Sequence, residues 1–192
     1  MEIPVETWDA AQNSEYDYWI RRGTRGLDKD ARDRLLYFYE VPLSFDGKVV
    51  VEVGCGLGNF LRVITAKERI GVEPLFDKFD ELFNMDVPGI QFIKGKGEII
   101  PLPDDKVDVV FCSNVLNHVQ YPEMVLKEIR RIMKPDAILY FDIHFDFQTV
   151  LHPHVFNRNS IKELLEKYFT VEKTIDKEFK FGAVCKWKKL TV

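Results

Sequence analysis

A glycine-rich segment, Gly54-Cys55-Gly56-Leu57-Gly58, directly follows an apolar run that ends at Glu52 and Val53. Glycine permits a sharp turn and a close approach of the backbone to a ligand, and the amides of such a turn attract polar and anionic groups. The spacing is G-x-G-x-G, which differs from the G-x-G-x-x-G of dinucleotide-binding proteins. The segment therefore predicts a ligand site, and a tight strand-to-helix turn without a ligand is the simpler alternative.

An acidic residue, Glu73, follows Gly54 after about 20 residues, at the end of the apolar run Ile70-Gly71-Val72. A carboxylate at this place can accept both hydrogen bonds of a ribose diol. A solvated acid in a turn is the alternative interpretation. Taken together, the glycines and Glu73 indicate a cofactor that contains adenosine, but they do not separate a nicotinamide dinucleotide from S-adenosylmethionine.

Alternating strands and helices must position these residues. Strands are predicted at Val49–Val53, Arg69–Val72, Ile90–Lys94, Val107–Cys112 and Ala137–Ile143, with helices at Asn59–Ala66, Phe76–Met85 and Tyr121–Met133. Such alternation is typical of an open parallel sheet with helices on both faces. Ligands of these sheets bind at the carboxyl ends of the strands, so functional residues are expected just after each strand.

The two ends of the chain depart from this alternation. Helices are predicted over Trp8–Arg22, from a cap at Asp28, and from Asn159 or Ser160 to Tyr168. Strands Phe169–Ile175 and Phe179–Trp187 are joined by three residues, which is too short for a parallel crossover and predicts an antiparallel hairpin. The prediction is one α/β domain over residues 1–192, with a Rossmann-like, doubly wound, mostly parallel seven-stranded sheet.

Composition restricts the class of protein. The 192 residues suit a single domain, and 27 Lys+Arg against 31 Asp+Glu give a net charge of −4, which argues against a nucleic-acid partner. No apolar stretch approaches the roughly 18 residues of a membrane span, and the first residues do not resemble a secretory signal. The three cysteines form no CxxC pair, which argues against zinc and disulfides. A cytoplasmic protein is therefore expected.

Two stretches resemble a known family. VEVGCGLGNF, residues 51–60, is similar to the first motif of class I S-adenosylmethionine-dependent methyltransferases, with E-x-G-x-G-x-G starting at Glu52. IKGKGEIIPLPDDKVDVVFCSNVLNHV, residues 93–119, resembles the subfamily that includes the ubiquinone/menaquinone-biosynthesis-type methyltransferases, here termed methyltransferase type 11-like. Lys134-Pro135 and the terminal hairpin fit the same pattern, so the resemblance extends from about Gly47 to the C-terminus.

The resemblance implies a cofactor site along the strand ends. The glycine turn would approach the methionine part, Glu73 would hold the ribose hydroxyls, and the residues after the fourth strand would line the pocket. The cofactor-binding residues expected on this basis are Tyr16, Trp19, Glu52, Gly54, Gly56, Glu73, Pro74, Gly97, Glu98 and Asn114. After the third strand the family usually has G-D-A-E, whereas this chain has Gly95-Lys96-Gly97-Glu98. Because lysine cannot accept a hydrogen bond, adenine would be recognised either by Glu98 or by the backbone of Gly97.

Upstream, Tyr16-Asp17-Tyr18-Trp19 resembles a Y-D-x-W stretch in related methyltransferases, in which an N-terminal helix folds over the cofactor. Residues 1–45 are therefore expected to form a helical lid, and residues 46–192 the core. Packing of these aromatic side chains in the core is the alternative.

Histidines are the candidate catalytic residues, because a base can take a proton from an oxygen or nitrogen nucleophile near neutral pH. His152 and His154 are placed in this role, in a substrate region that runs from Ile143 to Arg158. A structural role is favoured over a catalytic one for His118. A metal site built from Asp142, His144, Asp146, His152 and His154 is an alternative, but the spacing matches no zinc motif and no metal is predicted.

The sequence thus predicts a methyltransferase that uses S-adenosylmethionine and acts on a small molecule, with S-adenosylhomocysteine as the product. The methyl acceptor and the oligomeric state are not determined. A nicotinamide-dependent oxidoreductase and a non-catalytic cofactor-binding protein of the same fold are the alternatives.

Overall fold

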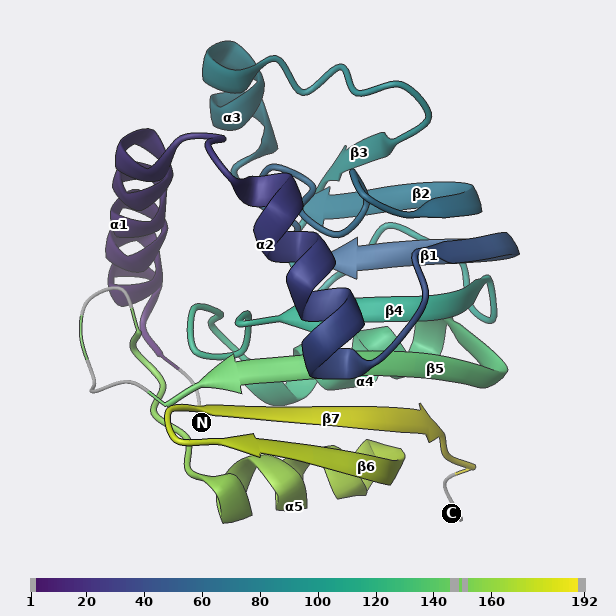
Figure 1. The fold of residues 1–192 in the computed structure, drawn as a ribbon. Helices are drawn as coiled ribbons and strands as arrows, with labels where there is room; N and C mark the ends of the chain where they lie inside the picture. Colours follow the sequence, from purple (N-terminus) through teal and green to yellow (C-terminus); the bar gives the residue numbers. More distant parts are fainter. Residues whose placement is uncertain (1–2, 146–148, 150–151, 190–192) are drawn as a thin grey trace.

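The structure is a computed structural model that describes residues 3–145, 149 and 152–189 (Figure 1). One seven-stranded sheet has the order β3-β2-β1-β4-β5-β7-β6. The strands are β1 (Ser44–Val53), β2 (Thr65–Glu73), β3 (Gln91–Lys94), β4 (Val107–Ser113), β5 (Met133–His144), β6 (Phe169–Lys177) and β7 (Lys180–Trp187). Strands β1 to β5 are parallel, and β7 is antiparallel to both β5 and β6. The predicted sheet and its terminal hairpin are confirmed.

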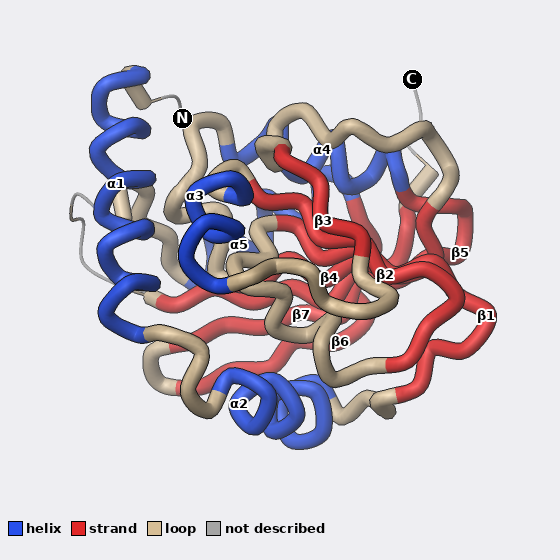
Figure 2. The backbone as a smooth tube through the Cα atoms, turned by 90° about the horizontal axis from the view of Figure 1, so that it is seen from above, coloured by secondary structure: helices blue, strands red, loops and turns tan. Residues whose placement is uncertain are grey.

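Helices cover both faces of the sheet. On one face lie α4 (Pro122–Ile132) and α5 (Arg158–Tyr168), and on the other lies α2 (Leu27–Asp33), which continues into the π-helical turn η1 (Arg34–Tyr39). Figure 2 shows α2 and α4 on opposite sides of the strands. Val50, Val51 and Val53 of β1 are fully buried, as expected for a central parallel strand that is covered on both faces.

Residues 3–43 contribute to two different layers. Helix α1 (Val5–Arg22) lies beside the carboxyl ends of the parallel strands, whereas α2 and η1 pack on a sheet face (Figure 1). Ala31, Leu35 and Tyr39 join a core cluster with Val50 and Phe111. Among the described residues, no helix combines the length and apolar character that crossing a bilayer requires.

The predicted helix over Asn59–Ala66 is wrong. The chain forms successive turns after β1, and β2 begins at Thr65. The end of the predicted helix belongs to the sheet, because Thr65 and Ala66 pair with Ser44 and Phe45 of β1. The backbone amides of Phe60 and Leu61 donate to the carboxylate of Glu52. The residues after β4, Leu116 to Val119, also form a turn.

Two helix caps differ from the predictions. Helix α2 is preceded by Gly26 in the left-handed conformation, and the side chain of Asp28 does not cap it. Helix α5 is capped by Asn157, two residues before the predicted Asn159. Ser160 completes a capping box, because its backbone amide donates to the Asn157 side chain and its hydroxyl accepts from the Asn157 amide.

Candidate cofactor and acceptor site

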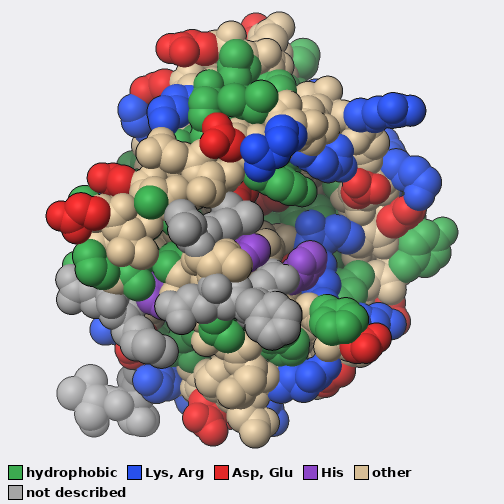
Figure 3. All heavy atoms as spheres, turned by 90° about the vertical axis from the view of Figure 1, so that its left-hand side faces the viewer, with side chains coloured by type: hydrophobic (Ala, Val, Ile, Leu, Met, Phe, Trp, Pro, Cys, Tyr) green, Lys and Arg blue, Asp and Glu red, His purple; other side chains and the backbone are tan. Residues whose placement is uncertain are grey.

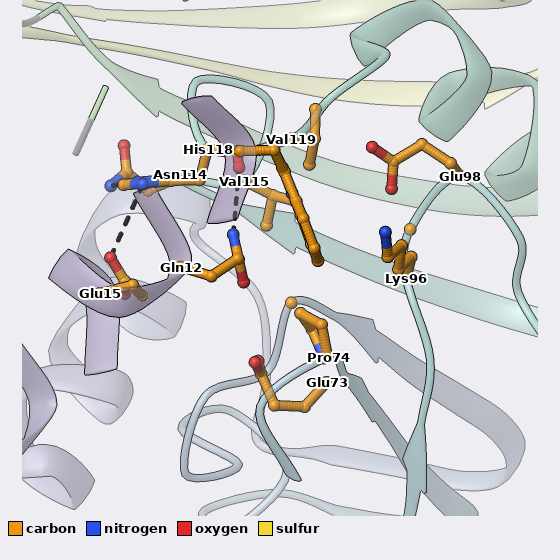
Figure 4. Close-up of a pocket in the computed structure, with 13 residues that line it drawn as sticks. Gln12, Glu15, Glu73, Pro74, Lys96, Glu98, Asn114, Val115, His118 and Val119 are labelled. Carbon is orange, nitrogen blue, oxygen red and sulfur yellow. Dashed lines mark hydrogen bonds and ion pairs between the residues drawn. The ribbon is translucent and has the colours of Figure 1, made fainter. Parts of the chain in front are cut away.

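Two cavities lie between α1 and the carboxyl ends of the strands. The larger has a volume of about 510 Å³ and the smaller about 70 Å³. Five residues line both: Glu15, Gly54, Glu73, Asn114 and His118. Figure 4 shows the smaller cavity, where side chains from α1 face the ends of β2 and β4. A ligand that occupied both cavities would extend along the carboxyl ends of β2, β1 and β4.

The glycine turn needs glycine for two reasons. Gly54 and Gly56 have φ of +63° and +53°, a region in which side chains with a Cβ are strained. A Cβ on Gly54 would lie 2.6 Å from Val115 Cγ2, and one on Gly56 would lie 2.8 Å from Trp19 Cζ2. The turn is thus packed tightly between the β4 loop and α1, and its backbone forms part of the cavity wall.

Glu73 lies at the end of β2 and is only 5% exposed. Its carboxylate accepts a hydrogen bond from Gly56 N at 2.9 Å and from Leu75 N at 3.0 Å. Burial raises the pKa of Glu73 to about 7, although these two amides oppose the shift. A carboxylate in this position is suited to accept hydrogen bonds from two hydroxyl groups.

Glu52, on β1, is buried below the turn and lines the larger cavity. Its Oε2 accepts from Phe60 N at 3.1 Å and from Leu61 N at 3.4 Å. Burial raises the pKa of Glu52 to about 8, although these two hydrogen bonds and the positive charge of Arg34 lower the pKa. Glu52 therefore organises the turn that replaces the predicted helix.

We expect Glu52→Gln to raise the melting temperature at pH 8 and to change it little near pH 5. The folded protein binds the Glu52 proton more tightly than the unfolded chain, so the wild type loses stability as pH rises toward 8. Glutamine keeps an acceptor oxygen for Phe60 N and cannot ionise. Thermal unfolding between pH 5 and 8.5 measures the effect. Glu178→Gln, on the exposed hairpin turn, is the control, and identical pH slopes for Glu52→Gln and wild type would contradict the prediction.

Helix α1 is tied to the loop that follows β4. Gln12 Nε2 of α1 donates to the carbonyl of His118 in this loop at 3.3 Å. Within α1, Trp19 Nε1 donates to Glu15 Oε1 at 2.8 Å and holds that carboxylate in place. The other carboxylate oxygen of Glu15 lies 3.6 Å from His118 Nδ1. Burial raises the pKa of Glu15, and the bond from Trp19 opposes this shift. These contacts close α1 over both cavities.

Asn114 fixes the orientation of His118. Its Oδ1 accepts from His144 N at 3.1 Å, so its Nδ2 faces His118 Nε2 at 3.3 Å. Since an amide nitrogen only donates, His118 Nε2 accepts and the Nδ1 proton points toward Glu15. The ring of His152 lies beside His118, with centroids 4.7 Å apart. The structure therefore brings His118 and His152 together, a pairing that the sequence did not indicate.

The structure brings most of the predicted site residues to the two cavities. Those that line one or both are Trp19, Glu52, Gly54, Gly56, Glu73, Pro74, Gly97, Glu98, Asn114 and His152. Tyr16 instead stacks on Phe79 of α3 (Phe76–Phe83) and is not among the described residues of either wall. His154 is 4% exposed, burial lowers its pKa, and it is likewise outside both described walls.

The loop after β3 is held by contacts that the sequence did not predict. Glu98 Oε1 accepts from Gln120 N at 2.7 Å and from Tyr121 N at 3.2 Å, so this carboxylate fastens the loop before α4. The ammonium of Lys96 lies 3.6 Å from the centroid of the Trp8 ring on α1. Lys96 thus forms a cation–π contact at the edge of the smaller cavity.

A buried ionic cluster below the larger cavity was also missed by the sequence. Asp142, at the end of β5, is fully buried and bonded to Arg34, Tyr39 and Lys180. Burial alone would raise the pKa of Asp142, but Arg34 and Lys180 outweigh it and hold the pKa at about 2. Its carboxylate is therefore engaged by cationic side chains of the protein. No group of three or more potential metal-ligating side chains occurs within the described part of the chain, and Asp146 lies outside that part.

Comparisons with solved structures agree with this architecture. A Thermotoga maritima protein described as a SAM-dependent methyltransferase has a TM-score of 0.68 and 21% identity, and the match covers 95% of this chain and all of that one. A Haloferax volcanii structure described as a complex between the Trm112 methyltransferase activator and the putative methyltransferase matches with a TM-score of 0.66 and 17% identity. That match covers 97% of this chain and 100% of the other. The fold is that of class I S-adenosylmethionine-dependent methyltransferases.

Sequence comparisons point to the same class. Residues 51–141 match the model of a family described as a methyltransferase domain. Human thiol S-methyltransferase TMT1B is 35% identical over 106 residues, which cover 51% of this chain and 43% of the relative. The mouse protein of the same name is 32% identical over 148 residues, covering 71% of this chain and 61% of the relative. The chain spans about half the length of these relatives. Residues 51–141 therefore match a methyltransferase domain, and these comparisons support S-adenosylmethionine as the cofactor.

The residues present fit that cofactor. Glu73 offers a buried carboxylate at the wall that both cavities share. Among the described side chains, Arg34 Nε and Asn59 Oδ1 are buried without a hydrogen-bond partner, and both residues line the larger cavity. Unpaired buried polar atoms are rare in proteins and indicate a ligand or water.

Proposed function

We propose that this protein transfers the methyl group of S-adenosylmethionine to a small-molecule acceptor. The observation that carries the proposal is the Glu73 carboxylate at the end of β2. It is buried from bulk solvent, accepts a hydrogen bond from Gly56 N and lines both cavities. The parallel strand ends support it, because cofactors of such sheets bind there. The order of the sheet and its antiparallel hairpin favour this function over a nicotinamide-dependent oxidoreductase.

In the proposed reaction, Glu73 holds the ribose hydroxyls, and the backbone of Gly54 and Gly56 lies against the methionine part. Asn114 lines the same pocket from the end of β4. The cofactor supplies a methyl group that is already activated on a sulfonium. The protein therefore has to align the acceptor and exclude water.

The proposal includes a lid. The smaller cavity, about 70 Å³, is below the roughly 300 Å³ of the smallest common ligand pockets, so an adenine placed in it would require a shift of α1. The contacts of Lys96 with Trp8 and of Gln12 with His118 hold α1 in its present place. Residues 1–192 then act as one domain in which α1 is the moving part of residues 1–45.

A thiol is the first acceptor to test. The human and mouse relatives at 35% and 32% identity are described as thiol S-methyltransferases. A thiol has an ordinary pKa of about 8.5 and needs little help from a base. Within the described part of the larger wall, His152 is suited to take its proton, whereas the buried position of His154 favours a structural role.

Calorimetry with S-adenosylhomocysteine tests the proposed function. We expect binding to the wild type and none with NADH. A folded protein that binds neither compound, or NADH alone, would refute the proposal. If S-adenosylhomocysteine binds but no methylated product forms from thiols, phenols, amines or acids, the non-catalytic alternative is favoured.

A further inference from the structure

The larger cavity is electrically asymmetric. Its acidic residues come from α1, α2, β1 and β2: Glu15, Asp30, Glu52 and Glu73. The ends of β5 and β7 contribute the basic side chains His144 and Lys180, and Arg34 of η1, which shares Asp142 with Lys180, lines the same cavity. Arg22 of α1 also lines the cavity, but it is paired with Asp30. Figure 3 shows histidine and basic side chains gathered on this face of the molecule.

The strand order separates the basic end from the cofactor residues. The proposed cofactor residues follow β2, β1 and β4. In the sheet, β5 and then β7 lie beyond β4, and each strand adds about 4.8 Å. Lys180 begins β7 and pairs in register with His144 at the end of β5. It therefore lies about 10 Å beyond the last strand that carries a cofactor residue, where the acceptor would be placed.

The cationic groups at this end exceed the acidic ones. Asp142 provides one buried negative charge, and both Arg34 and Lys180 are bonded to it. Glu52 does not balance the second cation at neutral pH, because burial raises its pKa to about 8. Two basic side chains of the described residues therefore share a single carboxylate beside the cavity. Burial lowers the pKa of Lys180, and a bound anion would oppose that shift.

We propose that Lys180, together with Arg34, binds a carboxylate group of the methyl acceptor. Arg34 and Lys180 share one carboxylate, so a second carboxylate would complete the cluster, and charge-assisted hydrogen bonds would fix the acceptor at the end of the cavity away from the cofactor. The inference rests on the proposed function and narrows the acceptor to a small carboxylic acid.

The test compares carboxylates with neutral amides of the same shape. Binding of 3-mercaptopropionate, 3-phenylpropionate and their primary amides is measured by calorimetry, with and without saturating S-adenosylhomocysteine. We expect at least one acid to bind at least tenfold more tightly than its amide. Lys180→Met should abolish this preference and leave the affinity for S-adenosylhomocysteine unchanged. Lys180→Arg, which keeps the charge, should retain the preference.

Lys177→Met is the matched control, because Lys177 is exposed at the same hairpin and should not affect either ligand. Equal binding of acids and amides, or no binding of any of them, overturns the inference. A loss of S-adenosylhomocysteine affinity in Lys180→Met with the acid preference intact also overturns it, because Lys180 would then serve the cofactor. Failure of the wild type to bind S-adenosylhomocysteine counts against the proposed function instead, and the titrations without it still test Lys180.

Discussion

Glu73→Ala should weaken the binding of S-adenosylhomocysteine by about 5- to 150-fold, which corresponds to about 1–3 kcal/mol. The substitution removes the proposed acceptor for the ribose hydroxyls. It also leaves the amides of Gly56 and Leu75 without the carboxylate to which they donate. Calorimetry at pH 8 measures the loss. Glu81→Ala, an exposed site on α3, should leave the affinity unchanged.

The pH dependence of binding gives a second measure of the same site. The pKa of Glu73 is about 7 in the free protein, and the ribose hydroxyls would bind best to its ionised form. Affinity for S-adenosylhomocysteine should therefore rise as pH increases through 7, with release of a proton. Glu73→Gln should remove the pH dependence that originates from this group. An affinity for Glu73→Ala equal to that of the wild type would mean that the ribose lies elsewhere.

Asp142→Ala should lower the free energy of unfolding by about 3–5 kcal/mol, since removing one partner of a buried ionic cluster leaves the others uncompensated. Arg34 and Lys180 would lose their shared carboxylate, and Tyr39 would lose its hydrogen-bond acceptor. Urea unfolding at pH 7 measures the change. Asp142→Asn keeps the shape of the side chain and should also be destabilising, because the cations would still lack a negative charge.

An exposed ion pair provides the comparison for Asp142. Asp176 bonds to Arg158 at 2.9 Å with about half of each side chain exposed, so Asp176→Ala should cost less than about 1 kcal/mol. The pKa of Asp142 is lowered in the folded state, so its stabilisation is present above pH 3.8 and lost as pH falls toward 2. An equal cost for both substitutions would contradict the assigned role of Asp142.

Much of the fold could be predicted because its signals are local. The valines of β1 and the apolar run of β5 are buried strands, and their β-branched and aromatic side chains indicate this without knowledge of the rest of the chain. The short connection between β6 and β7 predicted the hairpin for the same reason. The predicted helix over Asn59–Ala66 failed because Thr65 and Ala66 pair with Ser44 and Phe45 of β1, a contact that forms only in the folded sheet.

The candidate site divides in a similar way. Gly54 and Glu73 could be identified because a parallel sheet places the residues that follow its strands at one edge. Arg34 and Lys180 lie on η1 and β7, far apart in the sequence, and neither carries a local signal of function. The Asn114, His118 and Glu15 contacts were equally hidden, because α1 and the β4 loop meet only in the folded chain.

The sequence by itself therefore determined the class of fold, the glycine turn and the acid at the end of β2, since each depends on residue types close together in the chain. The tertiary structure alone decided which side chains share a cavity, which buried charges are balanced and how α1 covers the strand ends. These features arise from burial and from contacts between distant segments, which raise the pKa of Glu52 and Glu73 and lower that of Asp142. The acid and base character of the site is thus a property of its packing, not of its residue types.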